Sequence, residues 1–185
     1  MLWAALNAGA QAQPAWDAAR LMRSLAQVHA ATASFTETKT MAVLSTKLQT
    51  TGTLRYIAPD YLRKTILTPA PEDFVLQNGA VTLTGAGQTR HFTLSQAPQL
   101  AGLVEGVRAT LAGDLPALQR YYSISLSGGA RNWQLLLRPR DARLQQFLSW
   151  LCIRGHGDVI TGIDSAGAHG DQTSMQVHET PDHAL

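Results

Sequence analysis

The chain has 185 residues, of which 45% are hydrophobic and 15% are charged, and its formal net charge is +2. This length favours one domain with a substantial core. The small charge, carried by scattered basic residues, argues against nucleic-acid binding, and no apolar run approaches the ~20 residues of a membrane helix. The single cysteine, Cys152, cannot form an internal disulfide, and its apolar surroundings indicate a small buried hydrophobe.

The N-terminus resembles the end of a secretory leader. An apolar start is followed by Ala10-Gln11-Ala12, an A-x-A cleavage pattern. We interpret residues 1–12 as the remnant of a signal peptide and residues 13–185 as a single domain that begins at Gln13. The alternative interpretation is an alanine-rich tail.

The first half of the chain predicts one helix and then strands. Apolar residues with helical spacing predict a helix over Trp16–Ala30, with Asp17 as its N-cap. Alternating patterns then predict strands over 34–41, 47–57 and 61–67, the last two joined by a corner at Pro59. The segment 72–94 predicts three short strands, and Asn78-Gly79 is a strong hairpin signal.

The second half predicts another helix and further strands. The apolar face of Pro98–Gly113 is helical, with proline suited to the first turn and glycine to the end. Strands are predicted over 121–127, 132–138, 149–154, 159–164 and 174–179, with a turn at Gly128-Gly129 between the first two. The sequence therefore predicts an α+β fold in which ten to eleven antiparallel strands form a curved sheet covered by the two helices.

Catalytic signatures are weak throughout the chain. The glycine-rich segment 84–89 lacks the lysine and helix of a phosphate-binding loop, so a hairpin turn fits it better. The segments 155–158 and 168–171 each carry His-Gly-Asp, which suits either turns or, less readily, a metal pair. No nucleophile stands in a recognisable catalytic context. We expect no cofactor, no metal and no catalytic residue.

Several segments in order resemble the outer-membrane lipoprotein carrier family, the LolA-like proteins. They are ASFTET (33–38), GTLRYIAPDYLR (52–63), VLQNGAVTL (75–83) and GDQTSMQV (170–177), and the resemblance extends over most of 16–179. It implies an incomplete, highly curved antiparallel barrel closed by helices, whose apolar interior receives acyl chains. The family's best-known members carry lipoproteins across the periplasm, from an inner-membrane exporter to an outer-membrane receptor, and others are associated with lipid or pigment biosynthesis.

The chain departs from the family pattern at two places. Ala58 stands before the corner proline, where the well-studied carriers have an arginine that helps to hold the lid shut. Residues 81–84 are not aromatic, whereas those carriers have aromatic residues in this hairpin. We therefore expect a divergent member of the family.

Strand alternation and the lid helix predict which residues line an acyl-chain cavity. The predicted lining residues are Leu54, Tyr56, Phe74, Leu76, Leu103, Val107, Leu111, Trp133, Leu135, Leu137 and Trp150. Asp60, Arg63 and Lys64 are predicted at the cavity rim. The alternative is that these apolar residues form a packed core without a cavity.

Together these features predict a monomeric periplasmic carrier that binds an acylated lipoprotein or another lipid and delivers it toward the outer membrane. Its expected partners are this cargo, an inner-membrane exporter and an outer-membrane receptor. Two alternatives remain: a periplasmic scaffold module that binds proteins, and an enzyme acting on a lipid or pigment precursor.

Overall fold

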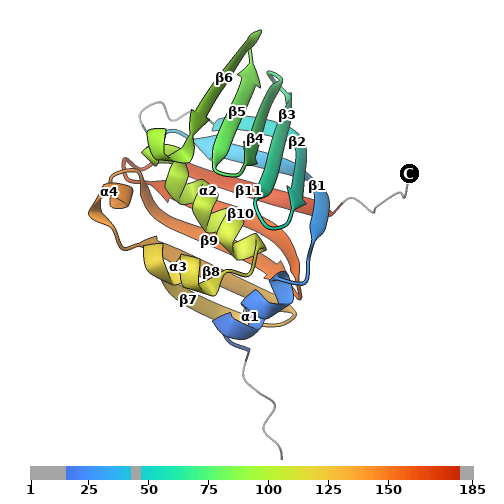
Figure 1. Cartoon of the computed structure of the whole chain (residues 1–185), viewed down its shortest axis with the longest axis vertical. Coiled ribbons are helices and arrows are strands. Elements are labelled where there is room, and N and C mark those ends of the chain that lie inside the picture. Colours follow the sequence, from blue (N-terminus) through green and yellow to red (C-terminus); the bar gives the residue numbers. More distant parts are fainter. Residues whose placement is uncertain (1–15, 43–46, 180–185) are drawn as a thin grey trace, which may run out of the picture.

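The computed structural model describes residues 16–42 and 47–179. The A-x-A motif at 10–12 and the expected mature N-terminus at Gln13 lie outside the described residues. Within these residues, eleven strands pair into one sheet, and helices cover one of its sides (Figure 1). None of the helices in 16–42 and 47–179 is both long and apolar enough to cross a membrane.

The leading helix, α1, spans Ala18–Leu25 and is shorter than the sequence predicts. Asp17 caps it as predicted, because its carboxylate accepts a hydrogen bond of 2.7 Å from a backbone amide in the first turn. The helix does not reach Ala30, because this residue already pairs with Ile57 in the sheet. Sheet pairing thus overrides the helical pattern at the end of this segment.

Six strands follow as a meander in which each strand pairs with the next. They are β1 (Ala30–Thr40), β2 (Lys47–Ile57), β3 (Tyr61–Thr68), β4 (Glu72–Gln77), β5 (Ala80–Gly85) and β6 (Gln88–Thr93). The predicted Asn-Gly hairpin is confirmed between β4 and β5, where Asn78 and Gly79 have φ angles of 50° and 73°.

A helical segment separates this meander from a second one. It contains the short 3-10 helix η1 (Leu94–Gln96), α2 (Pro98–Leu111) and α3 (Leu115–Tyr121). The second meander consists of β7 (Tyr122–Gly129), β8 (Asn132–Pro139), β9 (Leu148–His156), β10 (Val159–Gly167) and β11 (Gln172–Glu179), with α4 (Ala142–Gln145) after β8. The turn predicted at Gly128-Gly129 falls two residues later, because β7 continues through both glycines.

The strand order is β6-β5-β4-β3-β2-β1-β11-β10-β9-β8-β7. The first and last strands of the chain therefore meet in the middle of the sheet, where Phe35 lies opposite Val177 in an antiparallel pair. The sheet remains open between its edge strands, β6 and β7. This arrangement confirms the predicted α+β fold with a curved, incomplete antiparallel barrel and covering helices.

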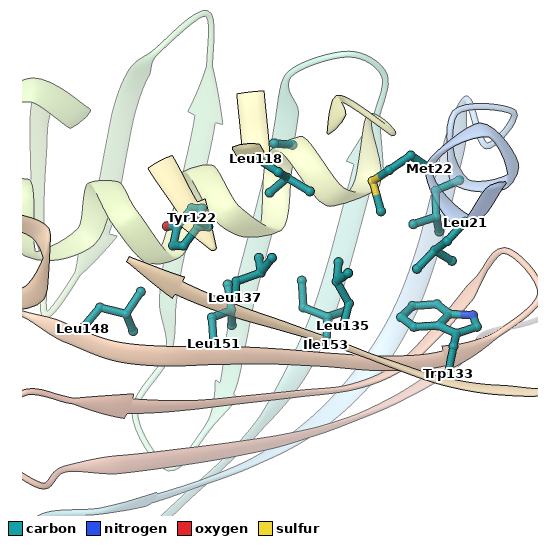
Figure 2. Close-up of a cluster of buried hydrophobic side chains, with 12 residues drawn as sticks. Leu21, Met22, Leu118, Tyr122, Trp133, Leu135, Leu137, Leu148, Leu151 and Ile153 are labelled. Atoms are coloured by element: carbon teal, nitrogen blue, oxygen red, sulfur yellow. The ribbon is translucent and has the colours of Figure 1, made fainter. Parts of the chain in front are cut away.

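A packed hydrophobic core fills one part of the space between the sheet and its helices. Figure 2 shows side chains of β8 and β9 pointing toward those of α1 and α3. The cluster consists of Leu21, Met22, Leu25, Ala109, Leu118, Tyr122, Trp133, Leu135, Leu137, Leu148, Leu151 and Ile153. None of the residues of this cluster comes from β1–β4.

Candidate functional site

A cavity of about 940 Å³ lies beside this core, on the same side of the sheet. Its wall comes from β1–β4, β10, β11, α2 and the end of α1. This volume is near the upper end of the range of ~300–1,000 Å³ typical of ligand sites. Part of the wall consists of exposed residues, Glu72, Asp158 and Glu179, so the cavity is open to water there.

The register of the strands explains why distant residues share the cavity wall. Leu54 lies opposite both Ala33 on β1 and Lys64 on β3, and Lys64 lies opposite Phe74 on β4. Glu179 on β11 lies opposite Ala33 and extends the row. Because directly opposed residues point to the same face of a sheet, this row forms part of one continuous surface. All five residues line the cavity.

Helix α2 covers the cavity, and the side chains on its two faces differ in size. A Cβ atom at Gly102 would lie 2.1 Å from Leu144 Cδ1, and one at Gly106 would lie 2.7 Å from Leu151 Cδ2. These glycines therefore let α2 approach α4 and β9 closely. The cavity is lined by larger residues of α2, which are Leu100, Leu103, Val104, Val107 and Leu111.

A buried tyrosine fixes the position of α2. Tyr122 is 1% exposed, and its hydroxyl donates a hydrogen bond to the backbone carbonyl oxygen of Gly102. Burial raises the pKa of Tyr122 well above its ordinary value, and the charge of Glu105 acts in the same direction. The hydroxyl therefore stays protonated and keeps its role as a donor.

An ion pair lies in the otherwise largely apolar wall. Lys64 Nζ donates a hydrogen bond to Glu37 Oε2 at 2.7 Å, and both residues line the cavity. The ammonium group also lies 5.0 Å from the centroid of the Phe35 ring, a cation–π distance. Lys64 was predicted at the rim, and the structure places it within the wall with a carboxylate partner.

Tyr56 supplies the second polar feature of the wall. Its side chain is 3% exposed and lines the cavity, and its hydroxyl has no hydrogen-bond partner among the described residues. Burial raises the pKa of Tyr56, although the nearby charge of Arg108 opposes this effect. The neutral hydroxyl is a buried donor without an acceptor, which is an unfavourable state unless a bound molecule supplies one.

The other two predicted rim residues differ in position. Arg63 contributes to the cavity lining, and its Nε donates a hydrogen bond to Asp73 Oδ1 at 2.8 Å. Burial raises the pKa of Asp73, but hydrogen bonds from Arg63 and Thr65 outweigh it, so the pKa lies below the ordinary value. Asp60 is not among the lining residues.

Of the predicted lining residues, six line the cavity: Leu54, Tyr56, Phe74, Leu103, Val107 and Leu111. The other five lie elsewhere. Trp133, Leu135 and Leu137 are at most 1% exposed and belong to the packed core, because α1 and α3 cover that part of the inner face. Leu76 is 1% exposed and also lies outside the lining.

Trp150 faces the opposite side of the sheet. It lies in a shallow hollow with Leu136 and Cys152, while the neighbouring Leu151 points into the core. The segment around Trp150 carries apolar residues on both faces of β9, so the alternating pattern could not show which face of the sheet Trp150 occupies. Cys152 is half-buried rather than fully buried, and burial raises the pKa of its thiol. A protonated thiol is a poor nucleophile.

Several residues of the wall were not predicted from the sequence. They include Glu37 on β1 and the apolar residues Ile163, Met175 and Val177 on β10 and β11. The signal for Glu37 was its even spacing from Ala33 and Phe35, which places all three on one face of β1. In residues 16–42 and 47–179, no three His, Cys, Asp or Glu side chains come together in a way that could hold a metal ion.

Comparisons with known proteins agree with this architecture. The model of the family described as outer membrane lipoprotein carrier protein LolA-like matches residues 10–180. A DUF1329 family protein from Desulfovibrio piger has 10% identity and a TM-score of 0.50, with 91% of this chain and 92% of that chain covered. A LolA superfamily protein from Nitrosomonas europaea has 10% identity and a TM-score of 0.48, with 90% and 94% covered. No curated protein matches the sequence.

Proposed function

Since the chain belongs to the outer membrane lipoprotein carrier protein LolA-like family, we propose that it is a periplasmic carrier that binds the acyl chains of a lipoprotein or another lipid in its cavity and delivers this cargo toward the outer membrane. The observation that carries the proposal is the cavity of about 940 Å³ beneath α2. Its partners are then the cargo, an inner-membrane exporter and an outer-membrane receptor, and it acts by binding rather than by turnover.

The chemistry of the wall supports acyl chains as cargo. Aliphatic and aromatic side chains from the sheet, such as Leu54 and Phe74, face those of α2, such as Leu103 and Val107. Transfer of an acyl chain from water to such a surface contributes ~0.8 kcal/mol per buried CH₂ group. A chain bound along this wall would therefore be held by many small contributions that depend little on its exact identity.

The experiment that tests the proposal compares two leucines on opposite faces of the sheet. The protein is recovered from the periplasm, its bound lipids are extracted and identified by mass spectrometry, and binding of a neutral fluorescent acyl probe is titrated. Leu103→Asp, in the cavity wall, should lose both the bound lipid and the probe. Leu136→Asp, in the shallow hollow of the opposite face, should retain both. Absence of bound lipid and probe in the unchanged protein would refute the proposal.

A further inference from the structure

The cavity wall contains charges that a carrier of plain hydrocarbon does not need. Lys64 on β3 reaches across β2 to Glu37 on β1, and the two charged groups are 2.7 Å apart. Gly52 lies between them on β2, opposite Phe35, and a Cβ atom at this position would lie 2.9 Å from the Phe35 ring, over which the Lys64 ammonium group is placed. The side chains of Lys64 and Glu37 are only 27% and 16% exposed. Both charges are therefore substantially removed from water and depend on each other.

The charge of a ligand that enters this cavity determines how the ligand interacts with the Glu37–Lys64 pair. An anionic head group that approaches Lys64 also approaches the Glu37 carboxylate, which repels it, and if it displaces Glu37 it leaves that carboxylate without a partner in a half-buried site. Removing one partner of such a pair is far less favourable than leaving it intact. A neutral head group leaves the pair undisturbed, and a zwitterionic one can offer each partner an opposite charge.

The other charges of the inner face act in the same direction. Glu72 on β4 lies opposite Ile66, and Glu179 on β11 lies opposite Ala33, so both share the face of the pair. Arg55 and Arg63 are also lining residues. On β2 and β3 they lie next to Leu54 and Lys64, which point inward, so by strand alternation the side chains of the two arginines point to the other face of the sheet. Asp158, in the turn before β10, adds a further carboxylate. Carboxylates therefore outnumber ammonium groups on the inner face.

The unpartnered hydroxyl of Tyr56 indicates what the ligand must supply. It lines the cavity, is buried and lacks an acceptor among the described residues. An acceptor oxygen on the bound molecule would satisfy this donor. An ester or amide carbonyl at the head of an acyl chain provides such an acceptor without adding charge.

We infer that the cavity selects amphiphiles whose head group is neutral or zwitterionic and whose acyl chain is joined through an ester or amide, and that the Glu37–Lys64 pair makes it reject anionic amphiphiles. This inference rests on the proposed function, because it names the class of lipid that the same cavity carries. Glu37 and Lys64 determine the specificity for the head group, and Tyr56 holds the acyl carbonyl.

The test uses amphiphiles of one chain length at neutral pH, each competing against the neutral acyl probe. They are a monoacylglycerol, a lysophosphatidylcholine and a free fatty acid. In the unchanged protein, the first two should displace the probe, and the fatty acid should bind at least about tenfold more weakly, which corresponds to ~1.4 kcal/mol. Equal affinity for the fatty acid would overturn the inference. Failure of the probe to bind at all would instead refute the proposed function.

Variants then assign the selectivity to the pair. Glu37→Gln leaves Lys64 uncompensated, so affinity for the fatty acid should rise about tenfold while that for the monoacylglycerol stays within about threefold. Lys64→Met should lower the affinity for the fatty acid further, which provides a second test if the first variant does not fold. The matched control is Asp164→Asn, which removes the carboxylate of the 2.7 Å pair with Arg154 on the opposite face and should change nothing. An unchanged fatty-acid affinity in both Glu37→Gln and Lys64→Met would overturn the assignment.

The same titrations test the tyrosine. Tyr56→Phe should lower the affinity for the monoacylglycerol several-fold, because the carbonyl of the ligand loses its hydrogen-bond donor. The affinity for an alkane of equal length should stay unchanged. An equal loss for the alkane would show that the ring, and not the hydroxyl, makes the contact.

Discussion

Replacing Leu135 by glutamate should unfold the protein, although the same change at Leu54 should not. Leu135 is completely buried, with Leu126 and Ile153 as its opposite residues on β7 and β9. The substitution removes ~2 kcal/mol of apolar burial and adds several kcal/mol for a buried, unpaired carboxylate. The sum is comparable with the whole free energy of unfolding of such a domain, ~5–15 kcal/mol.

Leu54 is the matched position on the cavity wall. It is half-buried, and its opposite residue on β3 is Lys64, so a carboxylate there meets both open space and an ammonium group. Leu54→Glu should lower the free energy of unfolding by less than ~2 kcal/mol and abolish acyl-probe binding. Circular dichroism and urea denaturation measure folding, and probe titration measures binding. A folded Leu135→Glu protein, or an unfolded Leu54→Glu protein, would refute this division between core and cavity.

Gly52→Ala should lower the free energy of unfolding by about 1–3 kcal/mol, because its Cβ would lie 1.9 Å from the Thr65 carbonyl oxygen; wild-type stability in urea would contradict this. Tyr122→Phe should cost about 1 kcal/mol in thermal unfolding, through loss of its hydrogen bond to α2, and no shift would show that the bond contributes nothing. Against the effect of burial, hydrogen bonds from Arg63 and Thr65 lower the pKa of Asp73, so its carboxylate stabilises the fold at pH values above its ordinary pKa of 3.8. This contribution is lost as the pH falls through the lower pKa of the folded state. The stability difference between the unchanged protein and Asp73→Asn should therefore shrink in acid, and a constant difference from neutral pH downward would contradict the assignment.

The order of the elements could be predicted from the sequence because the strands and their turns have strong local signals. Asn78-Gly79 correctly predicted one hairpin, and the helical spacing of apolar residues in the α2 segment distinguished this helix from the strands before and after it. The end of α1 was misplaced because pairing of Ala30 with β2 is a tertiary contact that no local pattern reveals. Local periodicity therefore defines the elements better than it defines their ends.

The division of the inner face into core and cavity could not be predicted in the same way. Leu54 and Leu135 have the same alternation, and both point to the inner face as expected. What separates them is which strands α1 and α3 cover, and this depends on the whole topology. The Glu37–Lys64 pair was missed for a similar reason, since the two residues are not on adjacent strands and meet only across Gly52.

The seam between β1 and β11 also has a consequence for how the chain folds. The hydroxyl of Ser34 donates to the carbonyl of His178, 144 positions away, across the contact that joins the two meanders. Hairpins within each meander close short loops, whereas this seam must close a loop of nearly the whole chain, and such distant pairings slow folding. The cavity wall includes residues on both sides of the seam. Each meander can therefore form early, but the cavity wall is not complete until the last strand has docked against the first.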